Sequence, residues 1–206
     1  MFDLLFQQYS GYQTLDILLE IIAVVFGILS VWFSKKNNIL VYPTGMISTS
    51  IFTYLLFKWS LLGDMMINAY YFMMSIYGWY IWTRKVNNIF TPISKVNSPE
   101  KITSLIIFFF SLSFVYGIYN YFDKWGSYTS YIDNFTTAIF FVAMWLMANR
   151  KIESWVFWII GNIISIPLYF YKGLTFTSIQ YIIFTVIAIS GYYTWKKILD
   201  NSNQTA

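Results

Sequence analysis

Seven long apolar stretches divide this chain, and they constrain its fold more than any other feature. A helix needs about 20 mostly apolar residues to cross a bilayer, and each stretch approaches that length. The first reads LDILLEIIAVVFGILSVWFS and the fourth reads ITSLIIFFFSLSFVYGIYNY. The spans expected from these stretches are residues 15–34, 38–57, 63–83, 102–121, 130–149, 153–171 and 174–195. The sequence therefore predicts an all-α membrane protein with seven transmembrane helices in a single transmembrane domain, residues 1–206.

The composition agrees with a membrane protein and excludes several chemistries. Hydrophobic residues make up 58% of the 206 residues and charged residues 11%, against about 25% charged in soluble proteins. A soluble core of this size is too small to hide so much apolar side chain. Cysteine and histidine are absent, which removes thiolates and the two commonest zinc ligands. We therefore expect no metal site and no cofactor. No basic segment precedes the first span, so we also expect no cleaved signal peptide.

The positions of Lys and Arg predict the orientation of the chain. With seven spans, ten of the thirteen basic residues fall on one side, and the other side holds Lys58, Lys124 and Lys172. Because cytoplasmic loops carry the excess of positive charge, we expect an external N-terminus and a cytoplasmic C-terminus. Basic residues spread over loops do not form a groove for nucleic acid, so the expected partner is membrane lipid. Trp82 and Trp195, near span ends, are typical of an aromatic belt at the membrane interface.

An internal repeat is visible at a spacing of 113 residues. The matched pairs are Glu20 with Asp133, Trp32 with Trp145, Gly78 with Gly191, and Trp82 with Trp195. Two three-helix units joined directly would be inverted relative to each other, and one extra span restores the same orientation. We therefore expect two parallel repeats, about 15–83 and 130–195, joined by a solvated loop (83–101) and a linking helix (102–121). This 3+1+3, SWEET-like arrangement leaves a central site that can open to either side, which is a transporter's design.

Polar residues inside the spans are the candidates for that site. Trp155, Trp158 and Asn162 have i, i+3 and i+7 spacing, so they share one face of the sixth span. An indole plate beside an amide suits a flat heterocycle, because the ring stacks and the amide pairs with its polar edge. The other role open to Asn162 is a hydrogen bond between helices. Further candidates to line the same cavity are Gln180, Asn68, Asn134 and Thr137.

Several other functions lack their residues. The sequence contains no Walker A motif for ATP hydrolysis, and the seventh span has no interior lysine for a retinal Schiff base. No pair of carboxylates lies deep in the spans, as an intramembrane aspartyl protease requires. A transporter is therefore the favoured function class, and an integral membrane enzyme is the alternative from another class.

Nearly the whole chain resembles a known family. The stretch DNFTTAIFFVAMWLMANRKIESWVFWIIGNIISIPLYFYKGLTFTSIQYIIFT (133–185), with IYGWYIW at 76–82, is similar to the PnuC vitamin transporters, whose type member carries nicotinamide riboside. The most specific element is WVFWIIGN, which matches the family pattern Trp-x-x-Trp-x-x-x-Asn at Trp155, Trp158 and Asn162.

This resemblance implies more than the residues establish by themselves. It implies facilitated diffusion of nicotinamide riboside across a bacterial plasma (inner) membrane, with the vitamin trapped by a cytoplasmic kinase that phosphorylates it. It also implies a homotrimer. Relatives of this family carry other vitamins, so thiamine remains the alternative substrate.

Overall fold

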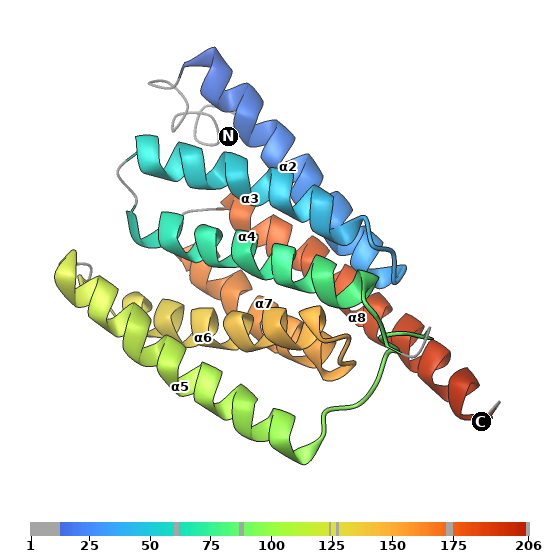
Figure 1. The fold of residues 1–206 in the computed structure, drawn as a ribbon. Coiled ribbons are helices and arrows are strands. Elements are labelled where there is room, and N and C mark those ends of the chain that lie inside the picture. The colour runs from blue at the N-terminus through green and yellow to red at the C-terminus, as the bar shows by residue number, and fades with distance from the viewer. Residues whose placement is uncertain are drawn as a thin grey trace.

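A computed structural model describes residues 13–59, 62–86, 89–123, 125–126, 128–171 and 175–204. The helices in these residues, shown in Figure 1, are α2 (Thr14–Lys35), α3 (Val41–Lys58), α4 (Leu62–Thr83), α5 (Ser98–Tyr121), α6 (Thr129–Ala148), α7 (Glu153–Tyr171) and α8 (Thr175–Gln204). Between α4 and α5, a short antiparallel hairpin pairs β1 (Lys85–Val86) with β2 (Ile89–Phe90). Each expected span therefore coincides with a helix, and the all-α fold is confirmed. Lys124 and Lys172 lie outside the described residues.

Six of these helices form a closed ring. Neighbours in the ring follow the order α2, α3, α4, α6, α7 and α8, and α8 returns to α2. The remaining helix, α5, lies outside this ring and packs mainly on α6 (Figure 1). The Asn134 side chain of α6 joins these two helices by donating a hydrogen bond to the Leu112 carbonyl of α5 at 3.2 Å. Each ring helix therefore has a side turned toward a common centre.

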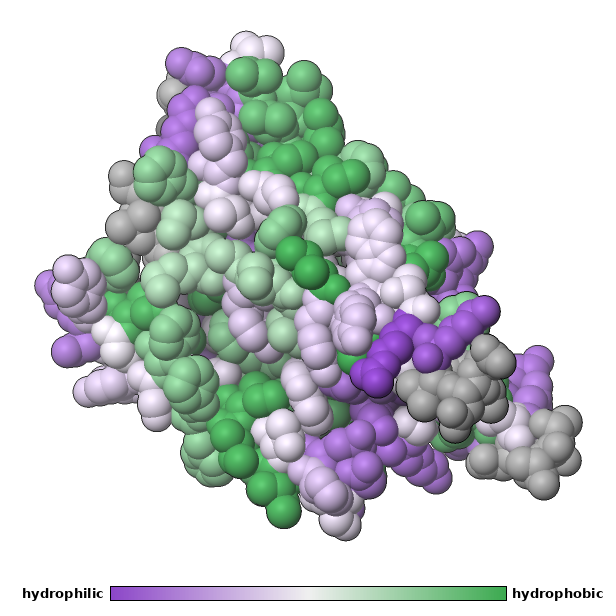
Figure 2. All heavy atoms as spheres, viewed as in Figure 1, coloured by the Kyte–Doolittle hydropathy of each residue, from purple (hydrophilic) through white to green (hydrophobic). Residues whose placement is uncertain are grey.

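The outside of the bundle is apolar along its length and polar at its ends. Large exposed side chains on α2 and α5 include Leu18, Ile21, Ile106 and Phe110. Figure 2 shows hydrophobic residues along the flanks of the bundle and hydrophilic residues gathered toward its two ends. In the described chain, α2, α5, α6 and α7 are long and apolar enough to cross a membrane by themselves, whereas α3 carries buried hydroxyl residues such as Ser48. So much exposed apolar surface requires lipid, and the chain is a multi-pass membrane protein.

The α2–α3 and α6–α7 turns have the same local structure at the spacing of 113 residues. Asn37 and Arg150, at matching positions, have φ angles of 52° and 54°, a left-handed conformation that is uncommon for residues other than glycine. In both turns the next residue, Asn38 or Lys151, donates its N–H to a carbonyl five residues earlier at 2.9 Å. The two turns therefore have the same backbone hydrogen bonds at positions that are 113 residues apart, as the repeat in the sequence predicts.

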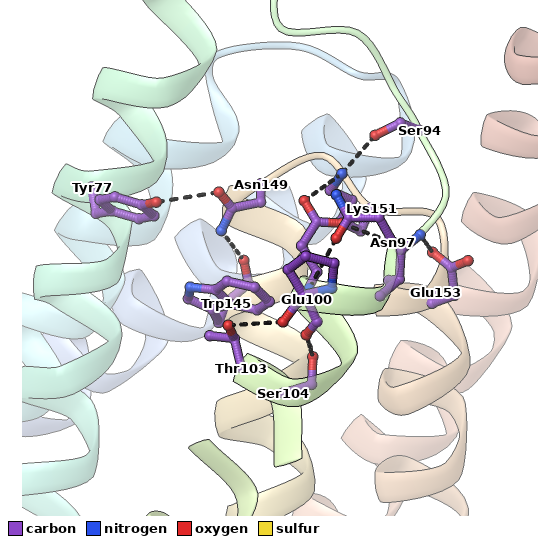
Figure 3. Close-up of polar contacts among 12 residues, drawn as sticks. Tyr77, Ser94, Asn97, Glu100, Thr103, Ser104, Trp145, Asn149, Lys151 and Glu153 are labelled. Atoms are coloured by element: carbon purple, nitrogen blue, oxygen red, sulfur yellow. Dashed lines mark hydrogen bonds and ion pairs between the residues drawn. The ribbon is translucent and has the colours of Figure 1, made fainter. Parts of the chain in front are cut away.

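The connection between α4 and α5 (83–101) is mostly exposed where the structure describes it, as the sequence predicts, and it is also anchored to the α6–α7 turn. Ile152, in the α6–α7 turn, donates its N–H to the Ser94 carbonyl at 3.0 Å. Lys151 donates to Ser94 Oγ at 2.9 Å and forms an ion pair with Glu100 at 2.7 Å (Figure 3). These contacts hold the start of α5 against the α6–α7 turn. They are polar contacts between distant residues, so a count of apolar residues along the sequence does not predict them.

Two helix ends differ from the expected spans for local reasons. The start of α5, at Ser98, is four residues early, because Asn97 and Glu100 form a capping box with two hydrogen bonds of 2.9 Å. The end of α8, at Gln204, extends nine residues beyond the expected span. Its extension carries Leu199, which is buried in the core. Both extensions lie outside the apolar stretches from which the spans were predicted.

Candidate functional site: a neutral cavity within the helix ring

The centre of the helix ring holds a cavity of about 270 Å³. All six ring helices contribute to its lining, and no lining residue comes from α5. Among the residues that the structure describes, the lining contains no Asp, Glu, Lys or Arg. A ligand in this cavity is therefore held by ring stacking and hydrogen bonds, and not by an ion pair.

Five of the seven site residues proposed from the sequence line this cavity. Trp155, Trp158 and Asn162 reach it from α7, as their shared helical face predicts. Asn68 reaches it from α4 and Gln180 from α8. Three amide side chains from three helices thus lie around one cavity together with two indole rings, which is the combination that we expected for a flat heterocycle.

Asn134 and Thr137 of α6 are not among the lining residues. Asn134 is buried, and its amide nitrogen bonds to α5 as described above. The position of Asn134 along the span is compatible with a place beside the cavity. Position along a span does not show, however, which side of the helix faces the centre of the ring. Since α6 packs on α5 as well as on ring helices, part of its polar surface serves the contact with α5. We therefore leave Asn134 and Thr137 out of the proposed site.

One wall of the cavity is aromatic. Phe140 of α6 stacks on Trp158, with ring centroids 5.4 Å apart and planes inclined by 27°. The Phe140 ring is also nearly parallel to that of Tyr181 in α8, at 6.1 Å and 9°. Gly161 makes room for this arrangement, because a Cβ atom there would lie 2.3 Å from the Phe140 ring. The sequence analysis missed Phe140 and Tyr181, since nothing in an aromatic-rich sequence distinguishes them from lipid-facing rings.

The facing wall, from α2, α3 and α4, carries hydroxyl groups. The lining serines and threonine are Ser30, Ser34, Ser48, Thr49 and Ser75. Each donates its proton to another protein atom, four to backbone carbonyls and one to a methionine sulfur. A hydroxyl that has donated its proton still has lone pairs, so each of these oxygens is able to accept a hydrogen bond. The sequence analysis missed this wall as well, because small hydroxyl residues in membrane helices commonly serve helix packing.

Four aromatic residues lie at the end of the cavity next to the α2–α3 and α6–α7 turns. We call them the aromatic layer: Tyr42, Trp82, Trp155 and Trp195. All four are at most 2% exposed. Tyr42 meets Trp82 edge to face at 5.1 Å, and Trp155 meets Trp195 in the same way at 5.5 Å. The burial of Trp82 and Trp195 corrects the expectation that they belong to an interfacial belt.

Hydrogen bonds across the ring fix two of the three tryptophans of this layer. The indole N–H of Trp82 in α4 donates to the Ala148 carbonyl of α6 at 3.1 Å. The indole N–H of Trp195 in α8 donates to the Ser34 carbonyl of α2 at 3.0 Å. The first bond therefore joins α4 to α6 and the second joins α8 to α2, and the second acceptor is one residue away from the position that the 113-residue spacing would give.

Two glycines allow the other members of the layer to pack tightly. A Cβ atom at Gly78 would lie 2.3 Å from the Tyr42 ring, and one at Gly191 would lie 2.7 Å from the Trp155 ring. Tyr42 and Trp155 also line the cavity. The Tyr42 hydroxyl and the Trp155 indole nitrogen are buried, and neither has a hydrogen-bond partner among the residues that the structure describes.

Arg150, in the α6–α7 turn, covers the outer side of the layer. Its guanidinium lies over the Trp82 ring at 4.2 Å from the centroid and donates a hydrogen bond to the Thr91 carbonyl. Burial lowers the pKa of Arg150 from its ordinary value, but a guanidinium stays charged at neutral pH. A permanent positive charge therefore lies on the outer side of the aromatic layer, at this end of the cavity.

The family model described as nicotinamide mononucleotide transporter matches residues 17–197, which include every described helix for most or all of its length. This chain belongs to the nicotinamide mononucleotide transporter family. The resemblance noted in the sequence is thereby confirmed.

Similar members of the nicotinamide mononucleotide transporter family come from several bacteria. The chain is 23% identical to the nicotinamide riboside transporter PnuC of Escherichia coli K12, covering 86% of this chain and 84% of the relative. It is 29% identical to PnuC of Neisseria mucosa, covering 89% and 74%, and 28% identical to PnuC of Haemophilus influenzae, covering 96% and 87%. A solved structure, the crystal structure of the vitamin B3 transporter PnuC, is similar with a TM-score of 0.68 and 24% identity over 97% of this chain and 89% of the other. That likeness shows a shared fold.

Proposed function

We propose that this chain carries nicotinamide riboside across a membrane by facilitated diffusion. The observation that carries the proposal is the central cavity, which is surrounded by an aromatic wall, three amides and a row of hydroxyls, with no charged group among the described lining residues. Relatives that are similar over most of the chain are named nicotinamide riboside transporters. This supports carriage rather than catalysis, in preference to the membrane enzyme that the sequence left open.

The chemistry of the cavity fits a cationic aromatic ring with polar substituents. A flat pyridinium stacks on Trp158 and gains a cation–π attraction without any carboxylate. The amides of Asn68, Asn162 and Gln180 pair with a carboxamide and with sugar hydroxyls, because an amide both donates and accepts. Thiamine, also a cationic heterocycle with a hydroxyl group, is the second candidate, because the same aromatic wall would stack on its rings.

The ring of helices supports a mechanism in which two halves move around a fixed site. In this proposal α2–α4 and α6–α8 are parallel repeats, and α5 is the linking helix of a 3+1+3 arrangement. The matching turns, the matching aromatic contacts and the position of α5 outside the ring support it. Rocking of one repeat against the other would expose the cavity to each side of the membrane in turn.

The orientation proposed from the charges assigns one end of the cavity to the cytoplasm and the other end to the outside of the cell. With the N-terminus outside and the C-terminus in the cytoplasm of a bacterial inner membrane, the aromatic layer closes the cytoplasmic end. The chain has no cysteine, so Ser202→Cys near the end of α8 introduces a single label site. A membrane-impermeant maleimide should modify it in inside-out vesicles and not in intact cells. Labelling of intact cells would reverse the orientation.

Two partners implied by the resemblance remain predictions. If a cytoplasmic kinase traps the vitamin, proteoliposomes that contain the kinase and ATP should accumulate label, and liposomes without them should only equilibrate. If the protein is a homotrimer, light scattering of the detergent-solubilised protein should give three times the mass of one chain after correction for detergent. The mass of a monomer would contradict the homotrimer. It would not affect the proposed site, because one chain supplies all six ring helices.

A binding titration tests the choice of substrate. Calorimetry on the purified protein should give saturable binding of nicotinamide riboside, with thiamine, riboflavin and a deoxynucleoside as competitors. The proposal expects nicotinamide riboside to bind most tightly. Tighter binding of thiamine would move the assignment to the second candidate, and no binding of either cation would reject a vitamin carrier of this kind.

A further inference from the structure

The two halves of the helix ring meet along two seams, one between α4 and α6 and one between α2 and α8. We call these the α4–α6 seam and the α2–α8 seam. In the α4–α6 seam, the Tyr70 ring stacks on Phe141 with centroids 3.9 Å apart and planes inclined by 14°, and the Tyr70 hydroxyl donates to the Phe141 carbonyl at 3.2 Å. Nearer the aromatic layer, the Tyr77 hydroxyl donates to Asn149 Oδ1 at 3.2 Å (Figure 3), and the indole bond of Trp82 follows. These contacts fasten α4 to α6 at several levels.

The α2–α8 seam carries different residues at the matching positions. At the spacing of 113 residues, Ile183 of α8 corresponds to Tyr70, and Ile28 of α2 corresponds to Phe141. A pair of isoleucines forms neither a ring stack nor a hydroxyl hydrogen bond. Ile183 is also 41% exposed, so a large part of its side chain lies outside the seam. Of these two matching places, the α4–α6 seam alone has the aromatic stack and its hydrogen bond.

The connection between α4 and α5 ties the α4–α6 seam at its end. Thr91, in this connection, is bonded on both sides of the seam. Its hydroxyl donates to the Ile81 carbonyl of α4 at 3.1 Å, and its carbonyl accepts a hydrogen bond from Arg150 of the α6–α7 turn. Farther along the connection, the Val96 N–H donates to the Glu153 carboxylate of α7 at 3.0 Å. One short segment therefore bonds to both halves of the ring.

We call this segment, residues 91–96, the clasp. Because the connection lies between α4 and α6 in the chain, the clasp holds the α4–α6 seam and not the α2–α8 seam. Separation of α4 from α6 would break a bond of Thr91 on one side or the other, together with the ring stack and the hydrogen bonds between the two helices. Buried hydrogen-bonding groups are costly to leave without partners. Parting α4 from α6 therefore costs more free energy than parting α2 from α8 at the matching positions.

We propose that the α4–α6 seam is a hinge that stays closed during transport, and that the end of the ring beside the aromatic layer opens along the α2–α8 seam. In this motion α2 and α3 swing away from α8 while α4 pivots on α6. Trp195 releases the Ser34 carbonyl of α2, and Trp82 keeps its bond to α6. This inference rests on the proposed function, because it names the part of the ring that moves during the proposed carriage.

Cross-links at matching positions of the two seams test which seam opens. Tyr77→Cys with Asn149→Cys places two thiols across the α4–α6 seam, and Ser190→Cys with Lys36→Cys places two at the matching positions of the α2–α8 seam. The chain has no cysteine, so a short bifunctional thiol reagent links only the chosen pair, and mass spectrometry of the digested protein verifies the link. We expect the link across α4–α6 to leave entry of labelled riboside into proteoliposomes unchanged. The link across α2–α8 should reduce entry to the level of empty liposomes.

The outcomes separate this inference from the proposed function. Each cysteine pair should still transport before the reagent is added, which shows that the variants fold. Entry that stops when α4 is linked to α6, or that continues when α2 is linked to α8, would overturn the hinge. If the unaltered protein carries neither riboside nor thiamine, the proposed function fails, and the hinge is then tested without substrate as follows.

Spin labels at the same two cysteine pairs measure the motion itself. The distances between labels on α2 and α8 should be distributed more widely than those between labels on α4 and α6, because the protein samples a closed and an open end along one seam alone. An α2–α8 distribution no wider than the α4–α6 distribution would contradict the hinge, whatever molecule the protein carries.

The same labels on α4 and α6 test the clasp. Thr91→Val removes the hydroxyl that bonds to the Ile81 carbonyl and keeps the size of the side chain. We expect it to widen the distribution of distances between α4 and α6. Thr83→Val is the matched control, because the Thr83 hydroxyl bonds to carbonyls of its own helix, and it should leave the distribution unchanged. A Thr91→Val distribution as narrow as that of the control would show that the clasp does not hold the seam.

Discussion

Ser34 of α2 donates its hydroxyl proton to the sulfur of Met147 of α6 at 2.9 Å, and these residues are 113 positions apart. Trp82 and Trp195, also 113 apart, have ring centroids separated by 5.9 Å. Residues related by a two-fold axis meet their own counterparts only close to that axis. The proposed axis between the repeats therefore passes through this end of the ring, and the motion that opens the end must separate these pairs.

A disulfide across this axis should hold the end closed. The chain contains no cysteine, so Ser34→Cys with Met147→Cys creates one possible cross-link. Oxidation should reduce uptake into proteoliposomes to the level of empty liposomes, and reduction should restore it. Each single cysteine variant should transport under both conditions. Full transport by the cross-linked protein would mean that these helices do not part during the cycle.

The two indole hydrogen bonds across the ring should contribute equally to stability. Trp82→Phe and Trp195→Phe each remove one N–H donor and leave a buried carbonyl without that partner. We expect each change to lower the free energy of unfolding by about 1–2 kcal/mol, with similar values for both. Unfolding in detergent measures this free energy when it is followed by circular dichroism, a signal that does not depend on tryptophan fluorescence. Trp79→Phe, at an exposed ring on α4, should have almost no effect. A large difference between the two buried sites would weaken the case for equivalent halves.

Removal of the ring at position 158 should weaken substrate binding far more than folding. Trp158→Ala removes the stacking surface beside Phe140, and stacking of a base on an aromatic side chain contributes about 1–3 kcal/mol. Binding of nicotinamide riboside should therefore weaken by about ten- to a hundredfold in calorimetry. Trp32→Ala, at an exposed ring, is the matched control. If both variants bind equally well, Trp158 is a packing residue and not a binding residue.

The ion pair that anchors the α4–α5 connection should be of modest strength. Glu100→Gln removes the charge opposite Lys151 and keeps a side chain that completes the capping box. Both side chains are partly exposed, so we expect a loss of about 1 kcal/mol or less, smaller at high salt. Unfolding at two salt concentrations measures it, and riboside affinity should stay unchanged. A strong loss of affinity would show that this connection controls the cavity.

The sequence predicted the helices well because lipid imposes a length and an apolar composition on a membrane span, and each of the seven apolar stretches approaches that length. The start of α5 was missed because Asn97 and Glu100 act through side-chain hydrogen bonds outside the apolar stretch. Trp82 and Trp195 were assigned to the membrane interface because position along a span does not show on which side of its helix a ring lies. Their neighbours, 66 and 161 residues away, decide that.

The site was predicted most completely where one helix carried it, although Asn68 of α4 and Gln180 of α8 were also predicted and line the cavity. Trp155, Trp158 and Asn162 share a face of α7, so their spacing alone brought them together. Asn134 has the same chemistry but bonds to α5, and only the packing of α6 distinguishes the two cases. The lining hydroxyl residues of α2, α3 and α4 gave no signal, because serine and threonine in a membrane helix indicate close packing before they indicate a ligand.

Uptake of labelled nicotinamide riboside into proteoliposomes tests the central claim most directly. The liposomes contain the purified protein and no ATP, ion gradient or membrane potential. The account predicts that label enters until the internal and external concentrations are equal, and that Trp158→Ala slows this entry. Failure of the label to enter would contradict carriage of the riboside, and accumulation above the external concentration would contradict facilitated diffusion.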